Sequence, residues 1–128
     1  MYLISRATEG TVINKYCAAG VDVYASGTLG QGSIVYNSAF MPNFFKCRNT
    51  SAITLTIPDS YSRDGQILDF WNLMGGNVHV VCSGSDRFIW RQKWNDDYQT
   101  YCDVGAGWHV HMQYDGTFGI WLCYGVNT

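Results

Sequence analysis

The fold class is decided by residues 53–81, which read ITLTIPDSYSRDGQILDFWNLMGGNVHVV. Apolar and polar side chains alternate strictly from Ile53 to Ile57, and this pattern places them on opposite faces of a β-strand. Pro58 follows at once, and a proline cannot donate a hydrogen bond to a sheet. The stretch therefore predicts consecutive strands joined by turns.

One part of this stretch also fits a helix. Ile67, Phe70, Trp71 and Met74 fall at helical spacing between two glycines. The segment is short for a helix, however, and a strand agrees with the segments on either side of it. We therefore predict a strand over Ile67–Asn72.

Short strand candidates recur along the chain about every ten residues, separated by Gly, Asn, Ser or Asp. They are Thr11–Ile13, Val21–Tyr24, Ser33–Tyr36, Ile53–Ile57, Ile67–Asn72, Val78–Cys82, Arg87–Trp94, Tyr98–Asp103, Trp108–Gln113 and Phe118–Tyr124. Such spacing is typical of a sandwich or barrel. No internal repeat or linker stands out, so residues 1–128 are expected to form a single all-β domain, an antiparallel β-sandwich.

The composition indicates a protein that associates with copies of itself. Charged residues make up only 14% of the 128 residues, while aromatic residues make up 16%. A small domain has a limited interior, so a subunit interface explains this apolar composition better than a larger core does. The formal net charge is −2, and the eight Lys and Arg are scattered, so nucleic acid is not an expected partner.

The five cysteines indicate a reducing environment. Their number is odd and no Cys-x-x-Cys pair occurs, so neither a complete disulfide framework nor a zinc site of that kind is predicted. We expect most of the thiols to be reduced and buried in a protein made in a cytoplasm. No apolar segment is long enough to span a bilayer, so no membrane insertion is expected.

The last two strand candidates predict a hairpin. Trp108, Val110 and Met112 share one face of the first strand, and we expect Phe118, Ile120 and Leu122 to share the same face of the second. A three-residue loop over 114–116 would pair Met112 with Phe118. His109 would then lie on the opposite face, beside Trp121.

The motifs of this region, read together, resemble a known family. They are Ile53-Thr54-Leu55-Thr56-Ile57-Pro58, Asp64-Gly65-Gln66-Ile67, Asn72-Leu73, Gly75-Gly76-Asn77-Val78-His79-Val80 and Tyr114-Asp115-Gly116-Thr117. Over about the last 75 residues, the chain is similar to the tip domains of bacteriophage tail fibres and tail needles. The resemblance implies a β-sandwich, often jelly-roll-like, that forms a homotrimer and either binds a host surface receptor or decorates the virion. The long fibre shaft that normally precedes such a tip does not occur in this chain.

A polar loop between aromatic residues is the candidate receptor-binding site. Trp94 and Tyr98 flank Asn95 and Asp97, and this set offers flat rings for a sugar together with an amide and a carboxylate for its hydroxyl groups. The alternative is that the aromatic residues of this region, Phe88 and Trp90 among them, are buried in the core. Exposure of Trp94 at a rim would distinguish the two interpretations.

His109 and His111 are the candidate metal ligands. A His-x-His pair places two imidazoles on one face of a strand, and three chains around an axis would supply six nitrogens for a transition metal. Some phage fibre tips resemble this arrangement. The alternative is an ordinary strand face with two imidazoles and no cofactor.

Catalysis is not expected. The chain has no Gly-x-Ser-x-Gly elbow, phosphate-binding glycine loop or His-Glu-x-x-His helix, although a glycosidase pair among its nine aspartates is an alternative. We expect a trimeric virion surface protein that recognises a host receptor, with a polysaccharide as one candidate ligand, and that contacts other virion proteins. A capsid decoration protein and a polysaccharide-cleaving enzyme are the two alternatives.

Overall fold

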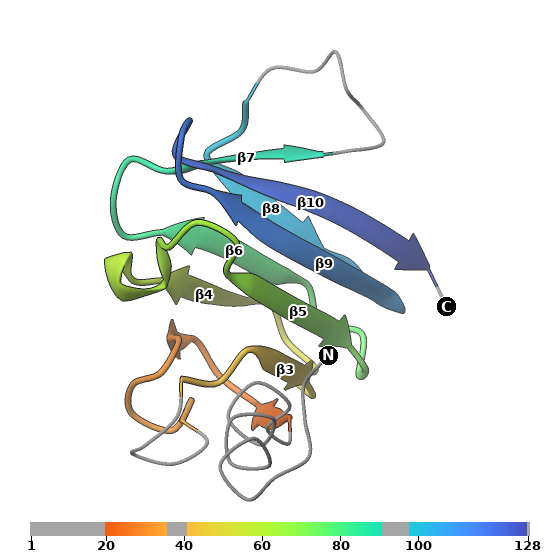
Figure 1. The fold of residues 1–128 in the computed structure, drawn as a ribbon. Helices are drawn as coiled ribbons and strands as arrows, with labels where there is room; N and C mark the ends of the chain where they lie inside the picture. Colours follow the sequence, from red (N-terminus) through yellow and green to blue (C-terminus); the bar gives the residue numbers. More distant parts are fainter. Residues whose placement is uncertain (1–19, 36–40, 91–97, 128) are drawn as a thin grey trace, which may run out of the picture.

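The computed structural model describes residues 20–35, 41–90 and 98–127, which form two β-sheets (Figure 1). In chain order the strands are β1 (Val21–Val23), β2 (Gly27–Thr28), β3 (Phe44–Cys47), β4 (Ile53–Ile57), β5 (Ile67–Asn72), β6 (Val78–Cys82), β7 (Arg87–Trp90), β8 (Tyr101–Val104), β9 (Trp108–Asp115) and β10 (Ile120–Asn127). A short 3-10 turn, η1 (Asp59–Tyr61), follows β4. The all-β prediction is confirmed, and within these ranges no segment forms a helix long enough to cross a membrane.

Strand positions agree closely with the sequence patterns. β4, β5 and β6 have the predicted bounds, which confirms the strand rather than the helix for Ile67–Asn72. The prediction of a strand from Ser33 is wrong, because Ser33 lies in a turn that begins after β2. Strands β2 and β3 were not predicted from the sequence. The candidate Thr11–Ile13 lies outside the described residues.

The chain alternates between the two sheets from β1 to β8. From β1 to β8, odd-numbered strands lie in one sheet and even-numbered strands in the other. Strands β9 and β10 both join the first, which is a six-stranded sheet of order β1-β3-β5-β9-β10-β7, and the second is a four-stranded sheet of order β2-β4-β6-β8. In Figure 1, β3, β5, β9 and β10 follow one another from bottom to top. Each connection from β1 to β9 therefore carries the chain from one sheet to the other, and the hairpin of β9 and β10 keeps both strands in one sheet.

This alternation produces three stacked strand pairs, β1 with β2, β3 with β4, and β5 with β6. Each pair has one strand in each sheet, and strands of successive pairs are parallel within each sheet. Val21 pairs with Phe45 and Phe45 with Phe70 in one sheet, and Leu55 pairs with Val80 in the other. The partners lie 24 or 25 positions apart in these pairs, so the fold repeats although the sequence shows no clear repeat.

The predicted antiparallel sandwich is wrong in its strand directions. Five of the eight strand pairings among the described residues are parallel. A jelly-roll-like order needs antiparallel neighbours, so β1 to β6 do not follow it. Alternating side chains reveal that a strand has two faces, but they carry no information about the direction of its neighbour.

Asn72 holds the turn that carries the chain from β5 to β6. Its Nδ2 donates to the carbonyl oxygens of Gly76 at 2.8 Å and Val104 at 2.9 Å, while its Oδ1 accepts from the Gly75 amide at 2.9 Å. The side chain is buried. One asparagine thus ties two backbone groups of the turn, at Gly75 and Gly76, to the carbonyl oxygen of Val104 on β8.

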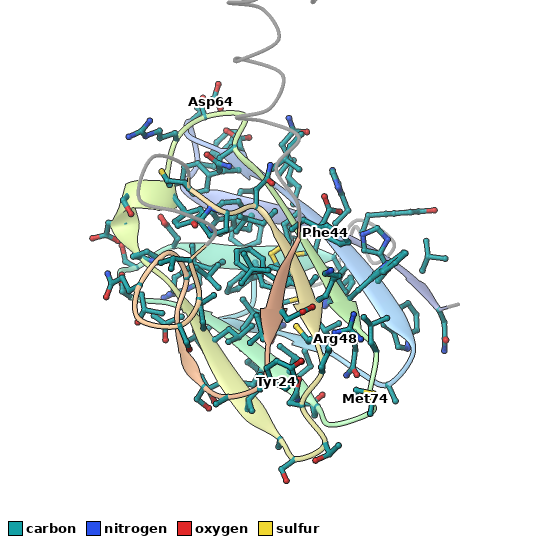
Figure 2. All side chains as sticks on the ribbon, turned by 90° about the horizontal axis from the view of Figure 1, so that it is seen from below. Tyr24, Phe44, Arg48, Asp64 and Met74 are labelled. Atoms are coloured by element: carbon teal, nitrogen blue, oxygen red, sulfur yellow. The ribbon has the colours of Figure 1, made fainter. Side chains whose placement is uncertain are left out.

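The inward faces of both sheets share one hydrophobic core, and side chains fill the space between them (Figure 2). Equivalent positions stack from one strand pair to the next: Phe45 and Phe70 lie with ring centroids 5.1 Å apart and nearly parallel. Trp121 on β10 is fully buried and contacts Tyr114. The core fixes both sheets, so residues that point outward belong to one of two outer faces.

The final hairpin has a different register from the one predicted. Met112 pairs with Cys123 rather than Phe118, because the loop runs over residues 116–119 and Gly119 adopts a φ of 67°. The Asp64 carboxylate accepts a hydrogen bond from the Gly116 amide at 2.9 Å and anchors the longer loop. Trp121 therefore points into the core and not to the face of His109.

Candidate functional site

The predicted receptor-binding loop is described only at its last residue. Trp94, Asn95 and Asp97 lie outside the described residues, and Tyr98 is 53% exposed. The next residue, Gln99, exchanges two backbone hydrogen bonds of 2.8 Å with Phe88. Tyr98 is therefore held beside the sheets, close in sequence to the edge strand β8.

Strand β8 continues the exposed surface that begins at Tyr98. Its burial alternates, so that Cys102 and Val104 enter the core while Tyr101 and Asp103 point outward. On the neighbouring strand β6, His79 pairs with Asp103. The outer face of the four-stranded sheet therefore brings together a tyrosine, a histidine and a carboxylate.

The contacts among these side chains are specific. The Tyr101 and His79 rings stack with centroids 5.0 Å apart and planes 28° apart. Oδ1 of Asp103 lies 2.8 Å from Nδ1 of His79 and accepts from Nδ2 of Asn77 at 3.2 Å. We name these four residues, Asn77, His79, Tyr101 and Asp103, the tyrosine platform.

The tyrosine platform leaves several polar atoms available to a ligand. A carboxylate can only accept, so His79 donates from Nδ1, and in the neutral imidazole its Nε2 keeps a free lone pair. Among the described residues, no hydrogen bond is made to Oδ2 of Asp103. Thr54 pairs with His79 across the sheet and adds a hydroxyl group beside the platform. The result is an exposed ring surrounded by hydrogen-bonding groups.

Sequence reasoning missed the tyrosine platform, although part of its signal was present. The alternation of Val78-His79-Val80 and of Cys102-Asp103-Val104 places His79 and Asp103 outward on their strands. Their contact depends on the pairing of β6 with β8, which the alternation does not encode.

The structure brings the predicted metal ligands, His109 and His111, together around a carboxylate. Both lie on β9, and the neighbouring strand β5 supplies Asp69 between them. Oδ1 of Asp69 is 2.8 Å from Nε2 of His109 and 2.9 Å from Nδ1 of His111. Each imidazole must donate from that nitrogen, so in the neutral imidazoles the opposite nitrogens, Nδ1 of His109 and Nε2 of His111, carry the free lone pairs.

This cluster is not a metal site within one chain. In the parts of the chain that the structure describes, no three or more His, Cys, Asp or Glu side chains are grouped so as to hold a metal ion. The site predicted from the sequence draws its nitrogens from three chains. It stays a prediction, with Asp69 as the group that fixes both histidine tautomers.

The described cysteines are not set up as nucleophiles. Cys47, Cys102 and Cys123 are buried, Cys82 is partly buried, and none of these four is in a disulfide. Burial raises the pKa of the Cys47 thiol to about 12, and burial together with the Asp86 charge raises the pKa of Cys82 to about 12. Such thiols stay protonated at neutral pH. Cys17 lies outside the described residues.

Several aspartates are engaged in structural contacts. Oδ1 and Oδ2 of Asp86 accept from the Tyr114 hydroxyl at 2.9 Å and the Ser62 hydroxyl at 2.6 Å. Asp115 accepts from the Thr117 amide at 2.9 Å. These carboxylates tie loops to strands, as expected for aspartates near strand ends.

Comparisons with known proteins find no matching family model, no matching curated protein and no matching solved structure.

Proposed function

We propose that this chain is a bacteriophage virion surface protein, the tip domain of a trimeric tail fibre or tail needle, and that it binds a saccharide on the host surface without cleaving it. The motifs between Ile53 and Thr117 support the assignment to a virion. The tyrosine platform carries the proposal of a saccharide ligand.

The platform offers an aromatic surface that is already fixed before a ligand arrives. Tyr101 is 41% exposed, and its ring is supported by His79, which Asp103 holds in turn. A ring fixed in this way loses little conformational freedom on binding, which favours affinity. It can stack against the apolar face of a sugar ring.

The polar groups of the platform match the hydroxyl groups of a sugar. Oδ2 of Asp103 accepts hydrogen bonds, Nε2 of His79 accepts, and the Thr54 hydroxyl can donate or accept. They surround the Tyr101 ring on the same outer face. We also propose Trp94, Asn95, Asp97 and Tyr98 as candidate ligand-binding residues.

A microarray of bacterial envelope polysaccharides, followed by calorimetry on the binding fraction, tests the saccharide proposal. Tyr101→Ala is expected to weaken binding about tenfold, which corresponds to about 1.4 kcal/mol of lost aromatic contact. Tyr24→Ala is the matched control, because Tyr24 is 65% exposed and lies outside the platform. Unchanged affinity in Tyr101→Ala would exclude the platform as the site.

Two further observations separate the alternatives. Labelled antibody imaged on the particle would place the chain at the tail, as proposed, or on the shell, as a capsid decoration protein requires. New reducing ends after incubation with a bound polysaccharide would identify a cleaving enzyme instead. A chain found on no virion would end the proposal.

We also propose that a trimer could hold a transition metal through His109 and His111. The supporting observation is that Asp69 fixes both tautomers, because metal-binding histidines commonly donate their other ring N–H to a carboxylate. Metal analysis of untagged protein tests this idea. A content below about one-third of an ion per chain, the stoichiometry of one site per threefold axis, would exclude it.

A further inference from the structure

The outer face of the six-stranded sheet carries a group of exposed or partly exposed apolar side chains. We name it the apolar face and define it by the outward side chains Phe44, Ile67, Trp71, Leu122, Tyr124 and Val126. Trp71 is 37% exposed, Tyr124 48% and Val126 45%. These residues come from β3, β5 and β10, so the face is assembled from segments far apart in sequence.

The apolar side chains of this face lie on both sides of the two histidines of β9. Trp71 lies opposite His109, which lies opposite Val126, and Asp69, His111 and Tyr124 form the next row. The Trp71 ring contacts Phe44 edge-on at 5.7 Å and His109 edge-on at 5.2 Å. An aromatic band therefore runs over three neighbouring strands.

Three polar side chains at the centre of this face are hydrogen-bonded to one another. Oδ1 of Asp69 contacts both His109 and His111, and the Asp69 side chain is only 24% exposed. Covering a polar group is least costly when it already has a hydrogen-bond partner. The cluster is therefore compatible with burial under another protein surface.

We infer that the apolar face is the surface through which copies of this chain associate. The inference rests on the proposed function, because it locates the subunit contact of the proposed trimer. It names the six-stranded sheet as the buried side and leaves the tyrosine platform, on the other sheet, accessible to ligand.

The size of the sheet fits a second copy. Six strands spaced about 4.8 Å apart span roughly 24 Å, and strands of about six residues span roughly 20 Å. Covering this face would bury on the order of 500 Å² on each copy. The total of about 1,000 Å² reaches the lower limit for a specific interface.

The charges at the rim of the face also fit a second copy. Asp22 on β1 contacts Lys46 at 3.5 Å and Arg48 at 2.9 Å, so both signs stand side by side. When two copies meet, Asp22 of one copy can lie against Lys46 or Arg48 of the other. A partner that carries mainly one sign of charge would meet like charges here. Self-association thus requires no second protein with a matching pattern.

Sedimentation velocity of the full chain tests the inference. The wild-type protein is expected to be oligomeric, and Trp71→Lys and Tyr124→Lys are each expected to weaken association at least 100-fold, because a lysine would be buried without a partner. Phe118→Lys is the control, since Phe118 is 71% exposed in the β9–β10 loop and lies outside the face. Thermal unfolding verifies that each variant is folded.

A second measurement avoids the risk that a lysine disturbs the sheet. A photo-reactive phenylalanine at position 124 is expected to cross-link chain to chain, and the same group at position 118 is not. Folded lysine variants as oligomeric as the wild type, or equal cross-linking at both positions, would overturn the inference. A monomeric wild type that still binds saccharide would refute the inference and the proposed trimer, but not the platform.

Discussion

The two outer faces of the molecule follow the same strand alternation but carry different side chains. Over the six-stranded sheet, aromatic and aliphatic groups such as Trp71 and Val126 surround the histidines. Over the four-stranded sheet, Thr54 and Thr56 alternate with core residues, and a single exposed tyrosine stacks on a histidine. A broad apolar surface favours contact with protein, and an isolated ring among polar groups favours a small polar ligand.

The difference shows that the outward position of a side chain does not by itself determine what the side chain does. Both faces contain a histidine held by an aspartate, His79 by Asp103 and His109 by Asp69. The two pairs differ in their neighbours and in the histidine nitrogen that contacts the carboxylate, Nδ1 in His79 and Nε2 in His109. The surroundings of a polar group therefore decide its use more than the group itself does.

The largest effect is expected from a core substitution that supports both faces at once. Phe70 is fully buried and stacks on Phe45. Phe70→Ala is expected to reduce the free energy of unfolding by about 3–5 kcal/mol, because it removes buried area and leaves a cavity. Urea denaturation measures this change, and saccharide binding and association should be lost together. Loss of only one of them would show that the faces do not depend on a common core.

A smaller effect is expected at the turn that joins the two sheets. Asn72→Ala removes three hydrogen bonds and leaves the Gly76 carbonyl oxygen with its bond from Asn49. We expect a loss of about 2–3 kcal/mol in the free energy of unfolding. Asn127→Ala, at an exposed position on β10, should change it by less than about 0.5 kcal/mol. Equal effects in both variants would argue against the structural role of Asn72.

Strand positions could be predicted from the sequence because the core is built by alternation. Ile53, Leu55 and Ile57 all enter the core, and the polar residues between them do not. β3 was missed because its four residues, Phe44 to Cys47, lack an alternation long enough to distinguish them from a loop.

The pairing of strands could not be predicted from alternation. The connection from β4 to β5 crosses between sheets, whereas a hairpin turn would have kept both strands in one sheet. The same limit applies to the hairpin register, because Asp64, more than 50 positions away from the loop residue Gly116 that it binds, anchors a loop longer than expected. Tertiary contacts of this kind decide the register.

For the candidate sites too, the outward position of a residue could be predicted from the sequence, but its contacts across strands could not. The outward placement of His109 and His111 was readable from their spacing, but their shared partner Asp69 depends on β5 lying beside β9. In the same way, the support of Tyr101 by His79 depends on β6 lying beside β8.

A sharper test asks whether substitutions on the two outer faces change the free energy of unfolding independently. Tyr101→Ala and Tyr124→Ala lie on different sheets, so their effects on the free energy of unfolding should add within about 0.5 kcal/mol. Trp71→Ala and His109→Ala are expected to behave differently, because these two rings are in contact. The effect of the double variant should depart from the sum of the single effects by more than about 0.5 kcal/mol. Denaturation of single and double variants supplies both cycles. Strong coupling between the tyrosines would contradict two separate faces.

The smallest effect is expected at the charged rim of the apolar face. The hydrogen bond from Arg48 lowers the pKa of the Asp22 carboxyl below its ordinary value of 3.8, and Lys46 acts in the same direction. A lowered pKa in the folded protein stabilises it above that ordinary value, and this contribution is lost as the pH falls through the folded pKa.

Asp22→Asn should therefore lower the unfolding temperature slightly at neutral pH and leave it unchanged at strongly acidic pH. Because this ion pair is exposed, high salt should reduce the neutral-pH difference as well. Thermal scans at two pH values and two salt concentrations measure it. If the unfolding temperatures of Asp22→Asn and the wild type still differed at acidic pH, the difference would have to come from packing. Asp22 would then be part of the apolar face and not of a charged rim around it.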